Sequence, residues 1–368
     1  MYRRPRKKVH LGWLLAIVAL VVLAGIGYGV YKLIAGTPEL DRDAFLLPTP
    51  NKDGVYPWSN GVLCVYDNKL ICNELNKDAP LWTIDLPASN MKARKEGDYT
   101  VAWGGNTTVL IDKEGINRGV MAEPEGTEVV LAVPGGSTFA VIIREEGQHR
   151  LRVYSVKDLS QVDEIRFPYA SVLGLGYFGE KSSQLWVLTV DSHGTDPVTR
   201  MTTYTPGKKY TGEITLRNEI AYAAVMQKDL TYLVGTHTQT VWEHGGETKP
   251  RKLIYGWNLQ DTLVGANGKV AFLFAPAGSG AQLSSLWYVN SDGTEYRFPL
   301  PAGCTKAMLK ENGRICAVTE NGVYSFAANG TSSRFFPLAN TVESISAVVP
   351  GKAFVIYSNH RNYLMNLP

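Results

Sequence analysis

The chain has 368 residues, of which 45% are hydrophobic and 19% charged, a composition typical of a folded globular protein and not of a disordered one. Its formal net charge of +3 is distributed unevenly. Five basic residues precede a long apolar segment and Lys32 follows it, so the rest of the chain carries 31 Lys and Arg against 34 Asp and Glu, a net charge of about −3. Such a surface does not attract phosphate backbones over long range, and we expect no nucleic-acid partner.

The apolar segment begins at Leu11 and reads LGWLLAIVALVVLAGIGYGVY, 21 residues without a charge. At about 1.5 Å per residue, a helix of this length spans the roughly 30 Å of bilayer hydrocarbon. Aromatic residues near both ends suit the membrane interfaces, and the basic cluster before Leu11 favours a cytoplasmic N-terminus. We predict a cytoplasmic tail over 1–10, a transmembrane helix over 11–31, a linker over 32–42 and an extracytoplasmic domain over 43–368.

Two other N-terminal signals fit the sequence less well. A cleaved signal peptide usually has a shorter apolar region and a small residue three positions before the cut, whereas a cut near Ala35 places Leu33 there. A lipoprotein needs a cysteine soon after the apolar run, and the first cysteine is Cys64. We therefore expect a single-pass protein anchored in the cell membrane.

The rest of the chain contains a repeat. A short apolar strand recurs with its first residue at intervals of 38, 39, 46, 46, 39, 44 and 39 residues, a mean near 42. This period fits a four-stranded blade of a β-propeller. We predict an all-β, eight-bladed propeller, with seven blades as the alternative. The recurring strands are GVLCVY from Gly61, YTVAWG from Tyr99, TFAVII from Thr138, QLWVLTV from Gln184, LTYLVGT from Leu230, KVAFLFA from Lys269, GRICAVT from Gly313 and KAFVIYS from Lys352.

Further strands follow each of these. A turn rich in Gly, Asn or Asp leads into a third strand, as expected for hairpins. The third strands are LICNEL, TVLID, LRVYSV, RMTTYT, TVWEH, SLWYVN, VYSFA and YLMNL. A fourth, more polar strand follows in most units, where charges and Pro protect a sheet edge from pairing with other chains. These segments are LWTIDLP, EIRFP, EITL, RKLIY, YRFPLP and RFFPL.

The last unit ends at Pro368 without a fourth strand of its own. Residues 44–48 read AFLLP and are similar to the fourth-strand segments YRFPLP and RFFPL. We predict that they close the last blade, with Phe45–Leu47 beside Tyr363–Leu367, so that only short sheet edges remain. The alternative is that residues 36–52 are only a stalk.

The four cysteines are too few for a disulfide framework in a domain of this size. A three-residue turn at Asp67–Lys69 would place Cys64 opposite Cys72, close enough for a bond, whereas a two-residue turn breaks that register and leaves two buried thiols. Cys304 and Cys316 do not fall opposite each other, and we expect no bridge between them.

No motif in the sequence identifies a reaction, so we expect no catalytic, cofactor or metal site. Ser192, His193 and Asp196 fall within one segment, but catalytic triads assemble from separated elements. The insertion from Asp191 to Arg200 belongs to a unit with a 46-residue interval and should protrude, where propellers place binding residues. We predict a binding site formed by Asp191, His193, Asp196 and Arg200.

Seven tryptophans recur at similar places after the apolar segment. They suggest either an aromatic platform for a sugar or peptide, or packing between blades. Packing is the favoured interpretation because large aromatic side chains are mostly buried. The seven are Trp58, Trp82, Trp103, Trp186, Trp242, Trp257 and Trp287.

With its basic start, single apolar segment and units such as GVLCVYDNKLICNELNKDAPLWT from Gly61, the chain resembles the membrane-anchored, WD40-like or quinoprotein-like β-propellers of Gram-positive bacteria, a family of unknown function. The resemblance implies architecture and location and carries no catalytic motif. Quinoprotein dehydrogenases have Thr-Gly before the Trp of the outer strand, whereas this chain has Ala79-Pro80-Leu81-Trp82, which argues against a bound quinone.

The expected function is therefore binding. We expect a cell-surface module of the cell envelope that binds or scaffolds a protein, a peptide or a glycan. The alternative from another class is a quinoprotein-like or glycan-active propeller enzyme.

Overall fold

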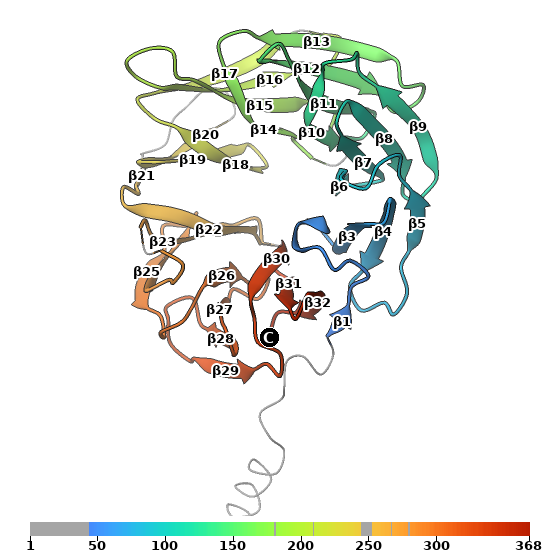
Figure 1. Cartoon of the computed structure of the whole chain (residues 1–368). Coiled ribbons are helices and arrows are strands. Elements are labelled where there is room, and N and C mark those ends of the chain that lie inside the picture. Colours follow the sequence, from blue (N-terminus) through green and yellow to red (C-terminus); the bar gives the residue numbers. More distant parts are fainter. Residues whose placement is uncertain (1–43, 180–181, 209, 244–251, 266, 279) are drawn as a thin grey trace, which may run out of the picture. The chain divides into compact units, whose positions relative to one another are not determined.

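The computed structural model describes residues 44–179, 182–208, 210–243, 252–265, 267–278 and 280–368. Their strands form eight four-stranded antiparallel sheets, which Figure 1 shows following one another around a ring. The described part of the chain is thus an all-β, eight-bladed propeller, as the repeat predicted. Its only helical element in the described ranges is the short 3-10 helix η2 (Lys52–Gly54).

The blades are numbered from the N-terminal end. Blade 1 contains β2 (Val55–Trp58), β3 (Gly61–Tyr66), β4 (Lys69–Glu74) and β5 (Trp82–Asp85). Blade 2 contains β6 (Lys92–Glu96), β7 (Tyr99–Gly104), β8 (Thr107–Asp112) and β9 (Asn117–Ala122). Blade 3 contains β10 (Glu128–Pro134), β11 (Thr138–Glu145), β12 (Gln148–Ser155) and β13 (Gln161–Phe167). Blade 4 contains β14 (Ser171–Tyr177), β15 (Leu185–Asp191), β16 (Val198–Tyr204) and β17 (Tyr210–Arg217).

The remaining blades follow the same order until the last. Blade 5 contains β18 (Ala221–Gln227), β19 (Leu230–Gly235), β20 (Thr238–Glu243) and β21 (Lys252–Leu253). Blade 6 contains β22 (Trp257–Val264), β23 (Val270–Pro276), β24 (Ser285–Asn290) and β25 (Glu295–Pro299). Blade 7 contains β26 (Lys306–Leu309), β27 (Ile315–Thr319), β28 (Gly322–Phe326) and β29 (Arg334–Pro337). Blade 8 contains β30 (Ser344–Val349), β31 (Ala353–Ser358), β32 (Arg361–Asn366) and β1 (Phe45–Leu46).

The second strand of each blade is almost continuously apolar because both of its faces are covered. A blade packs one face against the preceding blade and the other against the next, so alternation between polar and apolar residues is lost. The buried apolar residues form eight clusters, and each cluster spans one junction between consecutive blades. All seven tryptophans of the propeller lie in or against these clusters, which confirms the packing interpretation.

The N-terminal strand closes the ring. β1 pairs antiparallel with β32, with Phe45 opposite Leu364 and Leu46 opposite Tyr363. The predicted pairing of this segment with the last blade is therefore present. Burial along it is uneven, since Leu46 is 46% exposed and Leu47 only 3%. Leu47 packs into the cluster between blades 8 and 1 and Phe45 packs against it, so these two side chains provide the apolar contacts of the closing segment at this junction.

A buried amide fastens the segment that follows β1. Asn362 is fully buried in β32, and its Nδ2 donates to the carbonyl oxygens of Thr49 (2.9 Å) and Asn51 (3.1 Å). Its Oδ1 accepts a hydrogen bond from Ser346 (2.6 Å), and its carbonyl oxygen accepts from the N–H of Leu47 (2.9 Å). Every polar atom of this side chain is thus paired, which makes its burial favourable.

The cysteines are free thiols. Asp67 and Asn68 adopt positive φ angles of 51° and 55° in a two-residue hairpin turn, so Cys72 lies opposite Leu63 and not opposite Cys64. Of the two registers left open by the sequence, the structure has the one without a cross-strand bond. Burial raises the pKa of both Cys64 and Cys72 to about 12.

No helix in the described ranges is long and apolar enough to cross a membrane. The predicted tail, transmembrane helix and linker fall within residues 1–43, which lie outside those ranges. They stay predictions.

A carboxylate links the inner strands of blades 6 and 7. Asp261 lies at a bulge in β22, where its Oδ2 accepts the N–H of Leu309 in β26 (2.7 Å) and its Oδ1 accepts the N–H of Thr262 (2.8 Å). Burial nevertheless raises its pKa to about 6, because desolvation outweighs these hydrogen bonds and the nearby Lys306.

The first prediction concerns the closure of the ring. We expect Asn362→Ala to lower the free energy of unfolding by about 1–3 kcal/mol, because it removes the side-chain donor to the buried Thr49 carbonyl oxygen and the acceptor of the Ser346 hydroxyl. Asn366→Ala is the matched control on the same strand, where the amide is exposed and bonds only Asn76 (3.0 Å). Urea unfolding of the purified protein measures both. Equal stability of the two variants would mean that the Asn362 contacts do not hold the segment.

The second prediction concerns pH. Between its unfolded pKa of 3.8 and its folded pKa of about 6, Asp261 binds more protons in the folded protein than in the unfolded chain. Its contribution to stability is therefore present below pH 3.8 and is lost as the pH rises through 6. Relative to Asp261→Asn, wild-type stability should fall by on the order of 2–3 kcal/mol between about pH 4 and pH 7. Unfolding curves at several pH values test this, and a constant difference between the proteins would contradict it.

Candidate functional site

Each blade is an antiparallel meander, so its connections fall at two ends. At one end, which we name the crossover end, lie the turns between second and third strands and the connections from each blade to the next. At the other, the hairpin end, lie the turns between first and second and between third and fourth strands. Connections at either end are where a rigid scaffold such as this presents binding residues.

The residues predicted as a binding site lie at the crossover end of blade 4. β15 runs through Asp191 and β16 begins at Val198, so the connecting loop covers only 192–197. Arg200 lies inside β16, opposite Thr189 of β15. The loop is therefore shorter than the expected insertion from Asp191 to Arg200, because β16 begins at Val198, two residues before the predicted third strand.

Three of the four predicted residues come together. The Asp191 carboxylate accepts the N–H of His193 (3.1 Å), lies 3.3 Å from its ring Nδ1 and lies 3.9 Å from Arg200 Nη1. The backbone N–H, the imidazole and the guanidinium together lower the pKa of Asp191. The carboxylate thus fixes the start of the loop and the position of the largely exposed His193 ring.

Asp196 is held elsewhere. With the Asn218 amide turned so that its nitrogen faces the carboxylate, Asn218 donates to both Asp196 oxygens (3.1 and 3.2 Å). In the described ranges Ser192 makes no hydrogen bond to His193 or Asp196. The three residues therefore do not form a nucleophile, base and orienting acid.

Exposed aromatic side chains accompany this loop along the crossover end of blades 4 to 6. Tyr169, in the connection into blade 4, is 70% exposed, and its ring meets that of His193 edge-on at 6.2 Å. Tyr255, in the connection into blade 6, is also 70% exposed and stacks on His237 at 5.5 Å. Tyr222, at the start of β18, is 40% exposed, and its hydroxyl accepts a hydrogen bond from the N–H of a residue in β22. We name these five residues the aromatic surface.

A buried carboxylate positions the middle of the aromatic surface. Glu219, in the connection from blade 4 to blade 5, accepts hydrogen bonds from the Thr236 hydroxyl (3.0 Å), the His237 N–H (2.9 Å) and the Thr238 hydroxyl (2.9 Å). Its own carbonyl oxygen accepts from Thr199 of blade 4 (2.6 Å). The turn that carries His237 is thus tied to both blades, which holds the imidazole against Tyr255.

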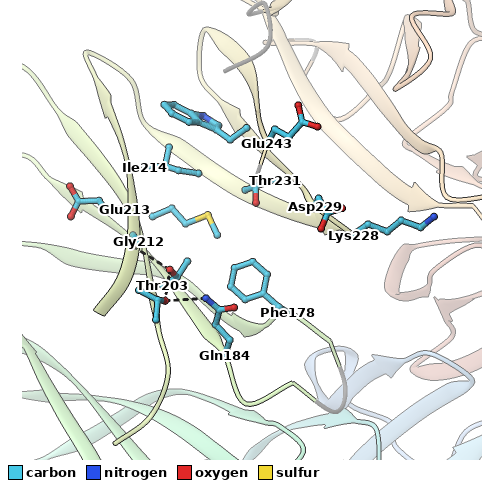
Figure 2. Close-up of a pocket in the computed structure, with 13 residues that line it drawn as sticks. Phe178, Gln184, Thr203, Gly212, Glu213, Ile214, Lys228, Asp229, Thr231 and Glu243 are labelled. Carbon is cyan, nitrogen blue, oxygen red and sulfur yellow. Dashed lines mark hydrogen bonds between the residues drawn. The ribbon is translucent and has the colours of Figure 1, made fainter. Parts of the chain in front are cut away.

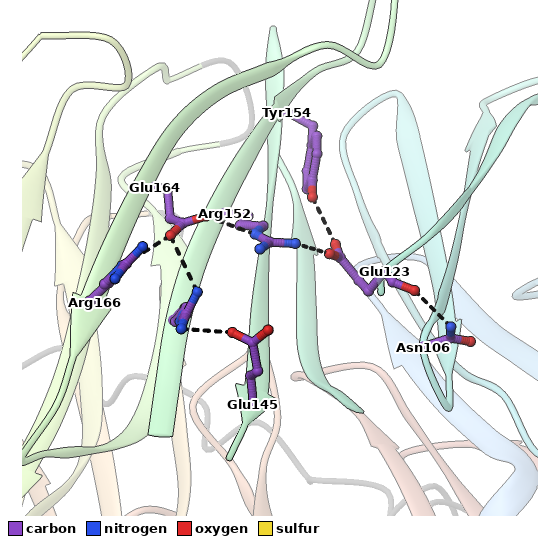
Figure 3. Close-up of polar contacts among 8 residues, drawn as sticks. Asn106, Glu123, Glu145, Arg152, Tyr154, Glu164 and Arg166 are labelled. Carbon is purple, nitrogen blue, oxygen red and sulfur yellow. Dashed lines mark hydrogen bonds and ion pairs between the residues drawn. The ribbon is translucent and has the colours of Figure 1, made fainter. Parts of the chain in front are cut away.

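A second buried carboxylate plays the same part between blades 2 and 3 (Figure 3). Glu123 lies in the connection between these blades, pairs with Arg152 and accepts a hydrogen bond from the Tyr154 hydroxyl (2.7 Å). Arg152 also pairs with Glu164 (3.0 Å), which in turn pairs with Arg166 (3.3 Å). Each charge in this network has an oppositely charged neighbour. The network therefore holds blade 3 against blade 2 and leaves little unpaired charge between these blades.

The described residues contain no cluster of three or more His, Cys, Asp or Glu side chains placed to hold a metal ion. Burial also raises the pKa of Cys304 and Cys316, to about 11 each, so these thiols stay protonated at neutral pH. What the crossover end of blades 4 to 6 offers is therefore a binding surface of aromatic rings, hydroxyl groups and imidazoles.

Sequence reasoning found His193 and its neighbours but did not group them with Tyr169, Tyr222, His237 and Tyr255, and it missed the buried Glu219 that positions His237. These residues lie in short connections from different blades, and only the register of the blades brings them together. The available signal was the position of each residue next to a predicted strand end.

No family model matches the chain, and no curated protein matches it. The solved structures that it resembles include WD40 domains. The C-terminal WD40 domain of Sif2 has 9% identity and a TM-score of 0.59, and the match covers 86% of this chain and 96% of that one. The WD40 domain of SCAP from fission yeast has 9% identity and a TM-score of 0.60, over 88% of this chain and 92% of that one. A chain in a mitotic checkpoint complex has 13% identity and a TM-score of 0.51, over 83% and 96%.

These likenesses show the fold. The chain has a WD40-like β-propeller fold. At identities of 9–13% nothing about partners or reactions transfers from these structures.

Proposed function

We propose that the chain is a membrane-tethered propeller of the bacterial cell envelope, and that a folded protein partner docks on the aromatic surface. The observation that carries the proposal is the gathering of exposed tyrosine and histidine rings at one end of blades 4 to 6. Aromatic residues are enriched in protein interfaces, where they bury large areas at little cost in side-chain entropy. A tyrosine also keeps a hydroxyl for hydrogen bonding at the rim.

The charges beside the aromatic surface favour a partner without strong net charge. Asp191 and Asp196 face Arg200 and Asn218 within blade 4, and Glu219 is buried with its hydrogen bonds satisfied. Only Asp191 has a cationic partner, but all three carboxylates accept hydrogen bonds within the chain, so the exposed rings and their contact area must provide most of the affinity. A protein face with apolar and neutral polar groups complements such a surface.

The membrane anchor in this proposal is inferred from the sequence alone. Residues 11–31 provide the apolar length of one span, and the basic residues before them favour an N-terminus in the cytoplasm. In this arrangement the propeller lies outside the cell membrane, and the partner is an envelope or extracellular protein.

The third prediction tests the surface in living cells. A photo-crosslinking amino acid placed at Tyr169 or Tyr255 should capture the same protein, and Tyr210, a tyrosine that is 56% exposed at the hairpin end, is the matched control position. The result expected is one adduct, identified by mass spectrometry, from both crossover positions and none from Tyr210. His237→Ala should reduce the adduct at Tyr255 several-fold, because the stacked ring holds Tyr255 in place. Adducts of equal yield at all three positions would overturn the proposed surface.

The fourth prediction tests the topology. In intact cells that lack an outer membrane, an impermeant maleimide should label Gly36→Cys and should label Tyr2→Cys only after lysis. The four native cysteines are buried, so they add little background labelling. Labelling of Tyr2→Cys alone would reverse the orientation, and labelling of neither before lysis would place the propeller inside the cell.

A further inference from the structure

The junction between blades 4 and 5 is packed differently from the other seven. Its cluster contains five buried apolar residues, whereas each other cluster in the described ranges contains at least eight. A groove lies at the hairpin end of this junction, with a volume of about 390 Å³. This lies within the range of about 300–1,000 Å³ typical of small-ligand sites.

Blade 4 supplies a wall of linked polar groups (Figure 2). The Gln184 amide donates to the Thr211 hydroxyl (3.0 Å), which lies 2.8 Å from the Thr203 hydroxyl, and Thr203 also donates to the carbonyl oxygen of Gly212 (3.3 Å). Because Thr211 is shared, the three side chains hold one another in fixed positions. The Gln184 Oε1 and its second amide hydrogen remain for a ligand.

Aromatic and aliphatic side chains cover the rest of the groove. Phe178, from the turn between β14 and β15, and Trp242, from β20, are half-buried, with Met201 and Ile214 beneath and beside them. The indole Nε1 of Trp242 donates to the Thr240 hydroxyl (3.3 Å), which fixes the ring. The groove therefore offers apolar ring surface next to preorganised hydrogen-bonding groups.

The charge of the groove narrows the ligand class. Glu213, Asp229 and Glu243 line it with Lys228 as the only basic residue among the described lining residues. Glu213 pairs with Arg200 (3.9 Å), and Lys228 adjoins Asp229 in the sequence, so an anionic ligand meets no unopposed cation in the described lining, whereas a neutral or amine-bearing ligand can donate hydrogen bonds to the carboxylate oxygens. Figure 2 shows Lys228 and Asp229 together on the blade 5 side, across the groove from Gln184 and Thr203.

We infer that this groove binds a short oligosaccharide of neutral or amino-bearing hexoses. A hexose ring has an apolar C–H face that stacks on aromatic rings and a rim of hydroxyl groups that pair with amides, hydroxyls and carboxylates, so it uses both walls at once. The site lies at the opposite end of the blades from the aromatic surface and shares no residue with it. It adds a second binding function to the one proposed above.

The fifth prediction is a titration of the full chain, purified in a detergent without a sugar headgroup. The probes are the trimer of N-acetylglucosamine, its deacetylated form and the trimer of galacturonic acid as the anionic control, followed by calorimetry and saturation-transfer NMR. We expect the first two to bind and the third not to bind. Gln184→Ala and Asp229→Ala, at the wall and the rim, should each weaken binding at least fivefold, and Trp242→Leu should weaken it more than tenfold.

The matched control comes from a similar groove at the hairpin end between blades 6 and 7, of about 360 Å³, which contains Lys269, Lys310 and Asn312 and neither Trp nor Phe. Asn312→Ala should leave saccharide binding unchanged, and so should His237→Ala on the aromatic surface. Absence of binding by both hexosamine trimers, tighter binding of the anionic trimer or of a lysine-rich peptide, or unchanged affinity in Gln184→Ala and Asp229→Ala would each overturn the inference. Because Trp242 packs in the blade 4–5 cluster, the two polar variants keep the test valid if Trp242→Leu unfolds.

Discussion

The structure depends on the closure of a ring from two distant parts of one chain. Each blade must cover an apolar face on both sides, so an open series of blades would leave two apolar faces in water. The pairing of β1 with β32 keeps these two apolar faces out of water. Leu47, which follows β1, is buried in the cluster between blades 8 and 1. Only two residue pairs make the strand contact, so the buried amide of Asn362 and the two carbonyl groups that it binds secure the segment beyond it.

Closure makes the blades equivalent in topology but not in packing. Seven junctions are filled by well-packed apolar clusters, and the junction between blades 4 and 5 is filled less completely. At its crossover end, Glu219 compensates with four hydrogen bonds that tie blade 4 to blade 5. These bonds hold the junction together at its crossover end, and the groove lies at its hairpin end.

The sequence predicted the second and third strands of every blade and most of the fourth strands, and it missed the first strands. Second and third strands are apolar runs flanked by turn residues, and all eight of each were found. First strands were not assigned, because bulges such as those near Val172 in β14 and Asp261 in β22 interrupt the two-residue period. β9 was also missed, since its alternating residues are half or fully exposed.

Only part of the candidate site was predictable, because sequence patterns reveal local structure and not contacts between blades. His193 was predicted because the longer repeat interval of its unit indicated a protruding loop. Its contact partner Asp191 is also close to it in the sequence. Tyr255 and His237 meet because β20 and β22 belong to neighbouring blades, and no pattern within either blade shows that register. Long-range register is set by the sum of all the junctions in the ring, so a sequence read blade by blade does not reveal which connections become neighbours.

The two ends of the propeller present different side chains because the connections at each end join different strands. At the crossover end, connections must pass from the outer strand of one blade to the inner strand of the next, and their exposed rings lie over a framework held by buried carboxylates. At the hairpin end, turns are local, so the space between two blades depends only on the side chains that face it. A large flat surface suits a folded protein, whereas a groove between two blades suits a small ligand. Since the residues of the two ends do not overlap, the proposed protein partner and the proposed saccharide would not compete for the same side chains.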